Sequence, residues 1–333
     1  MGPRVSLILP AYNAEGYLGR WFERNVFAQT FRPFEVVMVN DGSTDSTEAI
    51  ANKYAAKLET AGIHCHYVYQ QNQGIGSAIN TALKMFTGDY LAFIDADDFL
   101  TPDSIEKRVL FLETHPEYGF VRSDGAIFNH DNIDVSIGRL SNNNPSRFND
   151  RIFDDLLLEK TYCTPGCYML RVSALLAINP ARSIYPSREG QNWQILMPMA
   201  WNYRCGFIDE PLCHYVVYPN SISHKAKTFN DILARVDSGE DIMRNVLSNI
   251  DGIDWPYYKI IVACKDARKK LWLAFDFKKY NLAVKCVSKL CDNNGLRKID
   301  FLLMYGARWS ILNWVVRLLR KMVLYVKLKV RNE

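Results

Sequence analysis

Three carboxylates stand directly behind an apolar run in the stretch YLAFIDADDF, residues 90–99. The run is typical of a buried strand, so Asp95, Asp97 and Asp98 are expected where that strand leaves its sheet. Like charges held this close repel one another unless a cation lies between them. Carboxylate oxygens are ligands that Mg²⁺ and Mn²⁺ prefer, with water and substrate phosphates completing the coordination. The spacing of Asp95 and Asp97 therefore predicts a divalent metal site, whereas Asp98 is expected to cap the next helix.

The first hundred residues alternate between strand patterns and helical patterns. Apolar, β-branched runs predict four strands, each followed by a segment with helical spacing, at 5–12, 34–41, 63–70 and 89–96. Such alternation implies a mostly parallel sheet with helices on both faces. Ligands bind beyond the carboxyl ends of the strands in such sheets. Here those ends read PAYN, NDGSTD, QQNQG and DADD, which predicts a nucleotide-type site at one edge of an α/β fold.

Length, charge and cysteine content narrow the class of protein. A chain of 333 residues with 48% hydrophobic residues can bury a large core, as one large domain plus an appendage or as two domains. The net charge of +4 is too weak to indicate nucleic acid by itself. Eight scattered cysteines favour reduced thiols in a cytosolic protein. The first residues lack the pattern of a signal peptide, so none is expected.

The second half of the sequence reads differently. Residues 136–151, SIGRLSNNNPSRFNDR, are expected to form a polar loop, either a mobile substrate element or a surface insertion. From about 226 to 305 the spacing is helical, and the last 25 residues form a basic amphipathic segment. A membrane-spanning helix is disfavoured there because charges interrupt every apolar run. An interfacial helix on an anionic membrane and a helix packed on the domain or on a partner subunit are equally consistent with this segment.

Four motifs together resemble the nucleotide-sugar half of a family 2 glycosyltransferase with the GT-A fold. They read VSLILPAYN, VVMVNDGSTDST, NQGIGSAIN and GDYLAFIDADD, in that order, and span roughly residues 4–102. Weaker similarity extends to about residue 225. The resemblance implies a GT-A domain over 1–225, divided into a nucleotide-sugar half (1–102) and an acceptor half (103–225), followed by a helical C-terminal region (226–333).

The resemblance also implies roles for the residues that match the motifs. Asp95 would hold the ribose, Asp97 would bind the Mn²⁺ or Mg²⁺ that bridges the diphosphate, and Asp41 would accept a hydrogen bond from the base. The nucleotide would be bordered by Pro10, Ala11, Tyr12, Asn13, Asn72 and Gly74. The metal would neutralise the charge that develops as the nucleoside diphosphate leaves the anomeric carbon. Ile79 is a departure, because many relatives carry Arg there, in contact with the phosphate or donor.

The expected catalytic base is missing from its usual place. Family members usually carry Glu-Asp at the head of a helix in the acceptor half, where SREGQNWQILMP aligns Gln191 and Asn192 with that pair. Neither amide can act as a base, because neither titrates usefully. Three interpretations stand: Glu189 is the base on a shifted loop, Asn192 orients the acceptor while another group takes the proton, or the transfer activity is impaired. We favour Glu189, against the alternative of a loop glutamate exposed beside Arg188.

These observations predict a metal-dependent, inverting glycosyltransferase. It would move one sugar from a nucleoside-diphosphate donor, in our interpretation UDP-linked, to a glycan or lipid-linked oligosaccharide, as in bacterial surface-polysaccharide assembly. We expect a cytoplasmic protein with no nucleic-acid partner, whose segment 309–331 either makes peripheral contact with the inner, anionic face of the cell membrane or packs on protein. The alternative is a catalytically silent scaffold that binds nucleotide-sugars, because Gln191 and Asn192 replace the acid pair. A nicotinamide-dependent reductase is disfavoured, since Ile79 occupies the third glycine position of its fingerprint.

Overall fold

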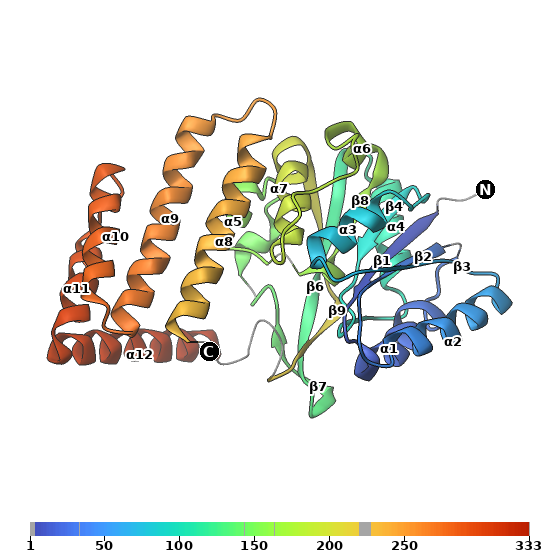
Figure 1. The fold of residues 1–333 in the computed structure, drawn as a ribbon, viewed down its shortest axis with the longest axis horizontal. Helices are drawn as coiled ribbons and strands as arrows, with labels where there is room; N and C mark the ends of the chain where they lie inside the picture. The colour runs from blue at the N-terminus through green and yellow to red at the C-terminus, as the bar shows by residue number, and fades with distance from the viewer. Residues whose placement is uncertain (1–3, 33, 143, 163, 220–227, 333) are drawn as a thin grey trace. The chain divides into compact units, whose positions relative to one another are not determined.

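The computed structural model describes residues 4–32, 34–142, 144–162, 164–219 and 228–332, with the backbone alone for 323–332. The chain divides into two compact units, Met1–Lys225 and Ala226–Glu333 (Figure 1). Seven cysteines in the described part are free thiols, and Cys163 lies outside the described residues.

One half of the sheet in the first unit is parallel, as the alternating pattern predicts. Its strands pair in the order β3 (His64–Gln70), β2 (Phe34–Asp41), β1 (Val5–Ala11) and β4 (Tyr90–Phe93). Helices α1 (Glu15–Phe22) and α2 (Thr47–Thr60) cover one face, and α3 (Ile75–Leu83) covers the other (Figure 1). Because β1 and β2 are buried on both faces, their sequences are continuous apolar runs. The parallel pairing brings all four carboxyl ends to one edge.

The other half of the sheet is mixed. From β4 it continues through β8 (Tyr168–Arg171), β6 (Tyr118–Asn129), β9 (Arg204–Val217) and β5 (Phe99–Leu100), and β7 (Asn132–Arg139) pairs with β6. β8 runs antiparallel to β4 and β6, whereas β6 and β9 are parallel. The helices of this half are α4 (Ser104–Thr114), α5 (Phe153–Leu157), α6 (Val172–Ile178) and α7 (Gln191–Asn202). The expected α/β class is confirmed, although only part of the sheet is parallel.

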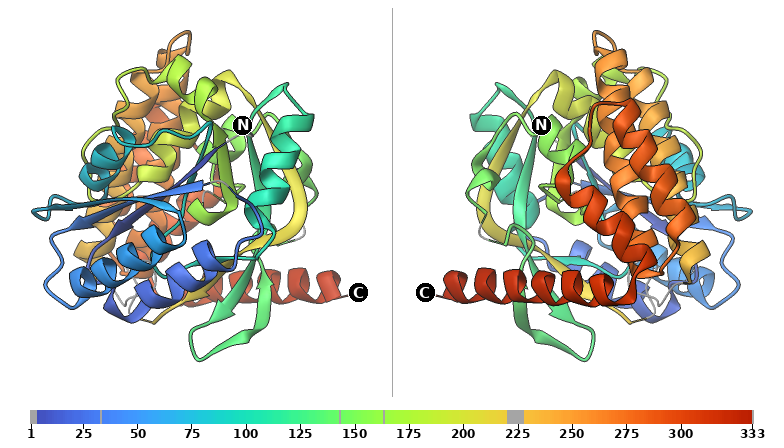
Figure 2. Two further views of the ribbon diagram at one scale, coloured as in Figure 1. Left: turned by 90° about the vertical axis from the view of Figure 1, so that its right-hand side faces the viewer. Right: turned by 90° about the vertical axis from the view of Figure 1, so that its left-hand side faces the viewer.

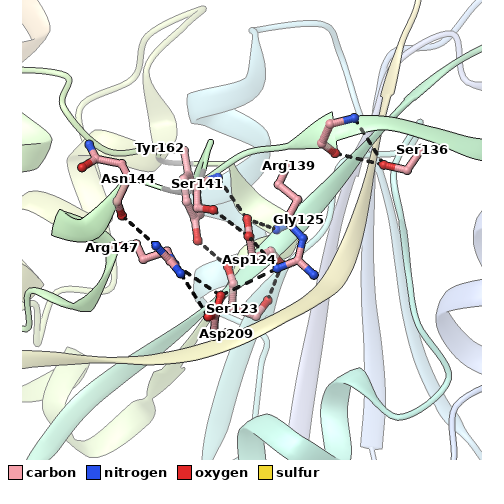
Figure 3. Close-up of polar contacts among 11 residues, drawn as sticks. Ser123, Asp124, Gly125, Ser136, Arg139, Ser141, Asn144, Arg147, Tyr162 and Asp209 are labelled. Carbon is pink, nitrogen blue, oxygen red and sulfur yellow. Dashed lines mark hydrogen bonds and ion pairs between the residues drawn. The ribbon is translucent and has the colours of Figure 1, made fainter. Parts of the chain in front are cut away.

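The segment expected to be a polar loop at 136–151 is partly regular, so that prediction is wrong for its first residues. Residues 136–139 belong to β7, and Pro145–Phe148 form a 3-10 turn. The buried carboxylate of Asp124 on β6 accepts hydrogen bonds from Ser141 N (3.0 Å), Ser141 Oγ (2.7 Å) and Gly125 N (2.8 Å), as Figure 3 shows. A second carboxylate, that of Asp209, accepts hydrogen bonds from both Nε and Nη2 of Arg147. Two acids outside the segment therefore anchor it, which its own polar composition could not reveal.

The second unit is helical, as its spacing predicts. It contains α8 (Phe229–Ser248), α9 (Trp255–Asp276), α10 (Tyr280–Asp292), α11 (Lys298–Arg308) and α12 (Ser310–Asn332). Leu271, Phe275, Leu290 and Leu303 are central members of its core. Within this unit α12 runs across the ends of the other helices (Figures 1 and 2). In the described part of the chain, no helix is long and apolar enough to cross a membrane.

One carboxylate ties three helices of the second unit together. Glu240 on α8 accepts hydrogen bonds from Arg244 Nη2 (2.7 Å), from Lys270 Nζ on α9 (2.9 Å) and from Lys289 Nζ on α10 (2.9 Å). Burial raises the pKa of Glu240, but the three cationic donors outweigh burial and lower that pKa to about 2. Because the folded-state pKa lies below the unfolded one, Glu240 stabilises the fold at neutral pH, and this contribution is lost as the pH falls from about 5 towards 2.

Glu240→Gln is therefore expected to lower the free energy of unfolding by about 3 kcal/mol at pH 7, because three cations lose their shared partner. Urea unfolding followed by circular dichroism measures the change, and the variant should lose part of the wild-type dependence on pH below 5. Asp292→Asn, which removes an exposed carboxylate of α10, is the control and should change stability little. Equal stability of Glu240→Gln and wild type would contradict this role.

Candidate functional site

The loops behind β1 and β2 interlock at the predicted edge. Asn13 N donates to Ser43 Oγ (3.0 Å), and Asn13 Oδ1 accepts from Thr44 N (2.8 Å). Asn13 adopts φ 48°, a left-handed conformation that Asn tolerates better than most residues. Pro10 and Ala11 end β1 beneath this contact, and the Tyr12 ring is 53% exposed. The four residues predicted to line the nucleotide pocket thus stand together at the carboxyl end of β1.

Asp41 organises the loop behind β3. Its carboxylate is buried and accepts hydrogen bonds from Gln70 Nε2 (2.7 Å), Gln73 N (3.1 Å) and Gly74 N (2.8 Å). Two of these bonds end on Oδ1 and one on Oδ2, so in the described part of the chain Oδ2 keeps an acceptor position for a ligand. The structure therefore brings Asp41, Asn72 and Gly74 together, with Asp41 also holding the loop in place.

Two glycines are required for this packing. Gly42 and Gly74 have φ values of +74° and +92°, which strain any L side chain. A Cβ at position 42 would lie 2.6 Å from Asn72 N, and a Cβ at position 74 would lie 2.8 Å from Arg188 Cγ. Backbones from three different loops therefore approach each other as closely as glycine allows.

Asp95 and Asp97 crowd negative charge at the end of β4. Burial, and then the charge of Asp97, raise the pKa of the Asp95 carboxyl to about 7. Burial also raises the pKa of Asp97, while the nearby Arg20 guanidinium acts in the opposite direction. Arg20 Nη2 donates to the Asp97 carbonyl oxygen (3.2 Å) and to Tyr218 Oη (2.7 Å). Arg20 therefore holds the backbone of the turn, and the repulsion between the two carboxylates is only partly offset.

Asp98 does not cap a helix, so that prediction is wrong. The short strand β5 intervenes after the acidic turn, and α4 begins only at Ser104. Asp98 is 2% exposed, and its Oδ1 accepts a hydrogen bond from Val216 N on β9 (3.1 Å). Its carbonyl oxygen accepts from Asn25 Nδ2 (3.1 Å). Asp98 thus fastens the acidic turn to a strand that lies far away in sequence.

A segment from the acceptor half crosses the amino-terminal end of α3; we call residues 184–190 the strap. Asn80 binds the backbone of Ile184 twice, through Oδ1 to N (2.7 Å) and Nδ2 to O (2.9 Å). Gly76 N donates to the Ser187 carbonyl oxygen (2.9 Å). On the other side, Gln194 Nε2 donates to Tyr185 O (3.0 Å) and Ser187 Oγ (2.9 Å). The strap is therefore fixed to the nucleotide-sugar half by α3 and to the acceptor half by α7.

The strap delivers Arg188 to the edge where the four strands end. Its Nη1 donates to Asn72 Oδ1 (3.2 Å), although the two residues are 116 positions apart. Ile79, where many relatives carry Arg, is 1% exposed and belongs to the core. A guanidinium thus reaches the predicted nucleotide site from the strap rather than from α3. The sequence analysis did not single out Asn80, Arg188 and Gln194 as site residues; only Asn80 lies in a recognisable motif.

The two candidate residues for the base lie on either side of a helix start. α7 begins at Gln191, as predicted, preceded by Gly190 at φ +71°. Glu189 is partly buried, and its carbonyl oxygen accepts from Ser187 Oγ (2.5 Å). Asn192 lines a small, mostly apolar pocket together with Phe93, Pro165, Tyr168, Leu170, Ile195 and Leu196. Since Phe93 is the last residue of β4, the pocket places Asn192 at the strand end that carries Asp95.

The family model described as Glycosyl transferase family 2 matches residues 6–178, about half of the chain. The chain belongs to this family. The match covers β1 to α6 and therefore includes all four strand ends of the parallel half.

Curated relatives of this glycosyltransferase match over shorter stretches. The putative glycosyltransferase EpsE of Bacillus subtilis is 30% identical over 195 residues, which cover 56% of this chain and 63% of EpsE. An uncharacterized glycosyltransferase of Rickettsia typhi is 38% identical over 110 residues, 33% of this chain and 32% of that protein. The chain therefore spans less than two thirds of the length of these relatives.

Solved structures share the fold of the glycosyltransferase. TarS of S. aureus in complex with UDP-GlcNAc superposes with a TM-score of 0.60 at 20% identity, covering 93% of this chain and 89% of that one. The mannosyltransferase PcManGT of Pyrobaculum calidifontis, in complex with GDP-Man and Mn²⁺, gives a TM-score of 0.55 at 17% identity, covering 96% and 88%. The GT-A fold that the sequence motifs imply is thereby confirmed.

The strap contact can be tested without an activity assay. A Cβ at position 76 would lie 2.7 Å from both Ser187 N and Ser187 O, so Gly76→Ala is expected to displace the strap. Trypsin should then cleave after Arg188 about fivefold faster than in the wild type, as measured by mass spectrometry. In Gly16→Ala the added methyl group meets nothing within 4 Å, so this control should cleave at the wild-type rate. Unchanged cleavage of Gly76→Ala would show that α3 does not hold the strap.

Proposed function

We propose that this family 2 glycosyltransferase is metal-dependent and inverting, and that it moves one sugar from a UDP-linked donor to a glycan or lipid-linked oligosaccharide. The observation that carries the proposal is the repelling pair Asp95 and Asp97, at the same edge as the loop built on Asp41. A nucleoside diphosphate held with a divalent cation would bring the positive charge that this pair lacks. TarS bound to UDP-GlcNAc and PcManGT bound to GDP-Man and Mn²⁺ share the fold and support the donor class.

The donor set suits Mn²⁺ or Mg²⁺. Asp95 and Asp97 offer only hard oxygen ligands, and a divalent cation would offset the burial and the charge of Asp97 that together raise the pKa of Asp95. The described part of the chain contains no group of three or more His, Cys, Asp or Glu side chains arranged to hold a metal ion. We therefore propose Asp97 as the protein ligand, with water and diphosphate oxygens completing the coordination, and Asp95 as the ribose contact. When bound, the metal would stabilise the negative charge of the leaving diphosphate.

The remaining roles fall to the chain's own residues. Asp41, through the acceptor position left on Oδ2, is proposed to bind the base; Asn72, Gly74 and the end of β1 border the nucleotide. The acceptor hydroxyl attacks the anomeric carbon opposite the leaving group, the bond from that carbon to the diphosphate oxygen breaks, and the hydroxyl proton passes to the base. We propose Glu189 as that base, because the strap that carries it is fixed to both halves of the domain. Asn192 is the alternative position, as a residue that orients the acceptor.

A catalytically silent, nucleotide-sugar-binding scaffold is the second candidate function. One observation favours it: α7 begins with the amides Gln191 and Asn192, where a carboxylate would have to stand to act from the helix head. The donor edge would be the same in both cases, so binding of UDP cannot separate the two functions. An assay of sugar transfer, or of slow hydrolysis of the donor, can separate them.

The lipid-linked acceptor and the position of the protein at a membrane are also part of the proposal. A lipid-linked acceptor would be presented at the inner face of a cell membrane, and the basic segment 309–331 would bring a cytoplasmic enzyme to it.

Asp97→Ala is expected to abolish the Mn²⁺-dependent stabilisation by UDP, because the carboxylate that anchors the metal is removed. Thermal unfolding with UDP and Mn²⁺ measures binding, and release of UDP from UDP-sugars should fall on the order of 100-fold or more. Asp131→Ala, which removes a carboxylate with 83% side-chain exposure in the β6–β7 hairpin, is the matched control. Wild-type binding of UDP and Mn²⁺ by Asp97→Ala would refute the donor-site assignment.

Glu189→Gln is expected to reduce transfer about 100- to 1000-fold while leaving UDP affinity unchanged, since a base acts on the acceptor rather than on the nucleotide. Steady-state rates with a UDP-sugar, together with calorimetric titration of UDP, separate the two effects. If Glu189→Gln transfers normally and Asn192→Ala does not, the base assignment is wrong. A wild-type chain that binds UDP and Mn²⁺ but turns over no UDP-sugar would favour the scaffold.

A further inference from the structure

The last helix exposes a stripe of large apolar side chains. Ile311, Trp314, Leu318 and Met322 are 81%, 63%, 43% and 56% exposed. Their spacing of three, four and four residues places them on one face of α12. Single exposed hydrophobic residues are ordinary, but a contiguous apolar stripe marks an interaction site.

The rotation of α12 is fixed by its opposite face, so the stripe is not a misplaced core face. Asn313 and Val316 are 4% and 7% exposed. Asn313 Nδ2 donates to the carbonyl oxygens of Phe275 (2.8 Å) and Gly306 (3.1 Å), on α9 and α11. At about 100° per residue, Asn313 and Val316 point roughly opposite to the stripe. The packing of the unit itself therefore turns the apolar stripe towards solvent.

The apolar surface continues onto α11. Phe301, Leu302 and Tyr305 are 43%, 46% and 38% exposed and lie on one face of that helix. The Tyr305 ring stacks on Trp309, with centroids 5.2 Å apart and planes 8° from parallel. Trp309 stands between the two helices and is itself 53% exposed. The stacked pair therefore joins the exposed faces of α11 and α12 into one surface.

Positive charge is concentrated in the same unit. Residues 226–333 contain 21 Lys or Arg against 11 Asp or Glu, whereas residues 1–225 contain 19 against 25. Lys298 and Arg308 lie at the two ends of the exposed face of α11, and Arg317 and Lys321 are exposed beside the stripe of α12. The net charge of +4 for the whole chain hides this separation.

We propose that the exposed faces of α11 and α12 form a binding surface for an anionic lipid bilayer. Apolar side chains would enter the boundary between headgroups and acyl chains, Trp309 and Trp314 would lie at headgroup level, and the basic residues would meet lipid phosphates. A second copy of the chain is the less suitable occupant, because two strongly positive units would then face each other. At 23 residues, α12 is about 34 Å long and suited to lying in the plane of the interface. The inference rests on the membrane contact stated under the proposed function and deepens it, whereas a vesicle assay reads lipid binding alone and can fail while sugar transfer is intact.

Co-sedimentation of the full chain with lipid vesicles tests the proposal. The chain should bind phosphatidylcholine vesicles that contain phosphatidylglycerol, should bind pure phosphatidylcholine vesicles more weakly, and should be released by salt. The double variant Trp314→Glu, Leu318→Glu should bind at least about tenfold less, because it places two charges in the apolar stripe. The control Val135→Glu, Ile137→Glu changes two side chains of β7 that are 59% and 58% exposed, and should bind as the wild type does.

A charge-only variant keeps the test informative if the double variant misfolds. Lys321→Glu leaves the apolar stripe intact and should weaken binding severalfold at low salt, with circular dichroism confirming unchanged helix content. Wild-type vesicle binding by the stripe variant would overturn the proposal, and so would equal loss in the β7 control. If the wild-type chain ignores the vesicles but is a dimer that the stripe variant dissociates, the surface is an interface between copies and the proposal fails.

Discussion

Burial of two neighbouring carboxylates, Asp95 and Asp97, is the constraint on which the acidic edge of the first unit depends, and the charge of Asp97 adds to it. The turn that carries the pair is held in place by contacts that do not neutralise it: Asp98 binds β9 through a backbone N–H, and Arg20 binds a backbone carbonyl. The fold therefore stabilises the position of the two carboxylates without removing their mutual repulsion. A cation that arrives with an anionic donor would stabilise the charged form of both carboxylates.

Close backbone contact links this acidic edge to the acceptor half. Gly42, Gly74 and Gly76 allow three loops to approach within distances that no side chain would permit. The strap is then held by Asn80 from one half and by Gln194 from the other. Because Arg188 and Glu189 are neighbours on the strap, the residue that contacts Asn72 and the candidate base share one rigid support. The two halves of the domain are in this way joined by close backbone packing together with side-chain amides that bind the backbone of the strap.

The second unit has a different physical basis. Its helices pack through an ordinary apolar core, and one buried carboxylate, Glu240, collects cations from three helices. In the described part of the unit, several basic residues are exposed, and Arg317 and Lys321 stand beside an apolar stripe that the core leaves unused. A unit with this charge and this surface is suited to a negatively charged boundary, as proposed above, whereas the first unit carries more acidic than basic residues.

Local pattern was enough for the parallel strands, the helical second unit and the edge where their polar carboxyl ends meet, because strand and helix periodicities and turn residues are properties of neighbouring positions. The start of α7 at Gln191 was expected from the resemblance to the family, which places a helix head there. Contacts between distant residues could not be predicted in this way. Asp98 accepts a hydrogen bond from β9 instead of capping a helix. Two acids from other elements anchor the segment at 136–151. Arg188 donates to Asn72, which lies 116 positions away in the sequence.

The rotation of α12 about its own axis shows the same difference between local pattern and tertiary contacts. The sequence by itself determined that the last segment is a basic amphipathic helix, since spacing alone defines a stripe. Which face of that helix meets solvent depends on the packing of Val316 in the core and on the bonds of Asn313 to two carbonyl groups on α9 and α11. The physical reason is general: periodicity is set by the backbone of one segment, whereas the partner of each polar group is set by the packing of the whole unit.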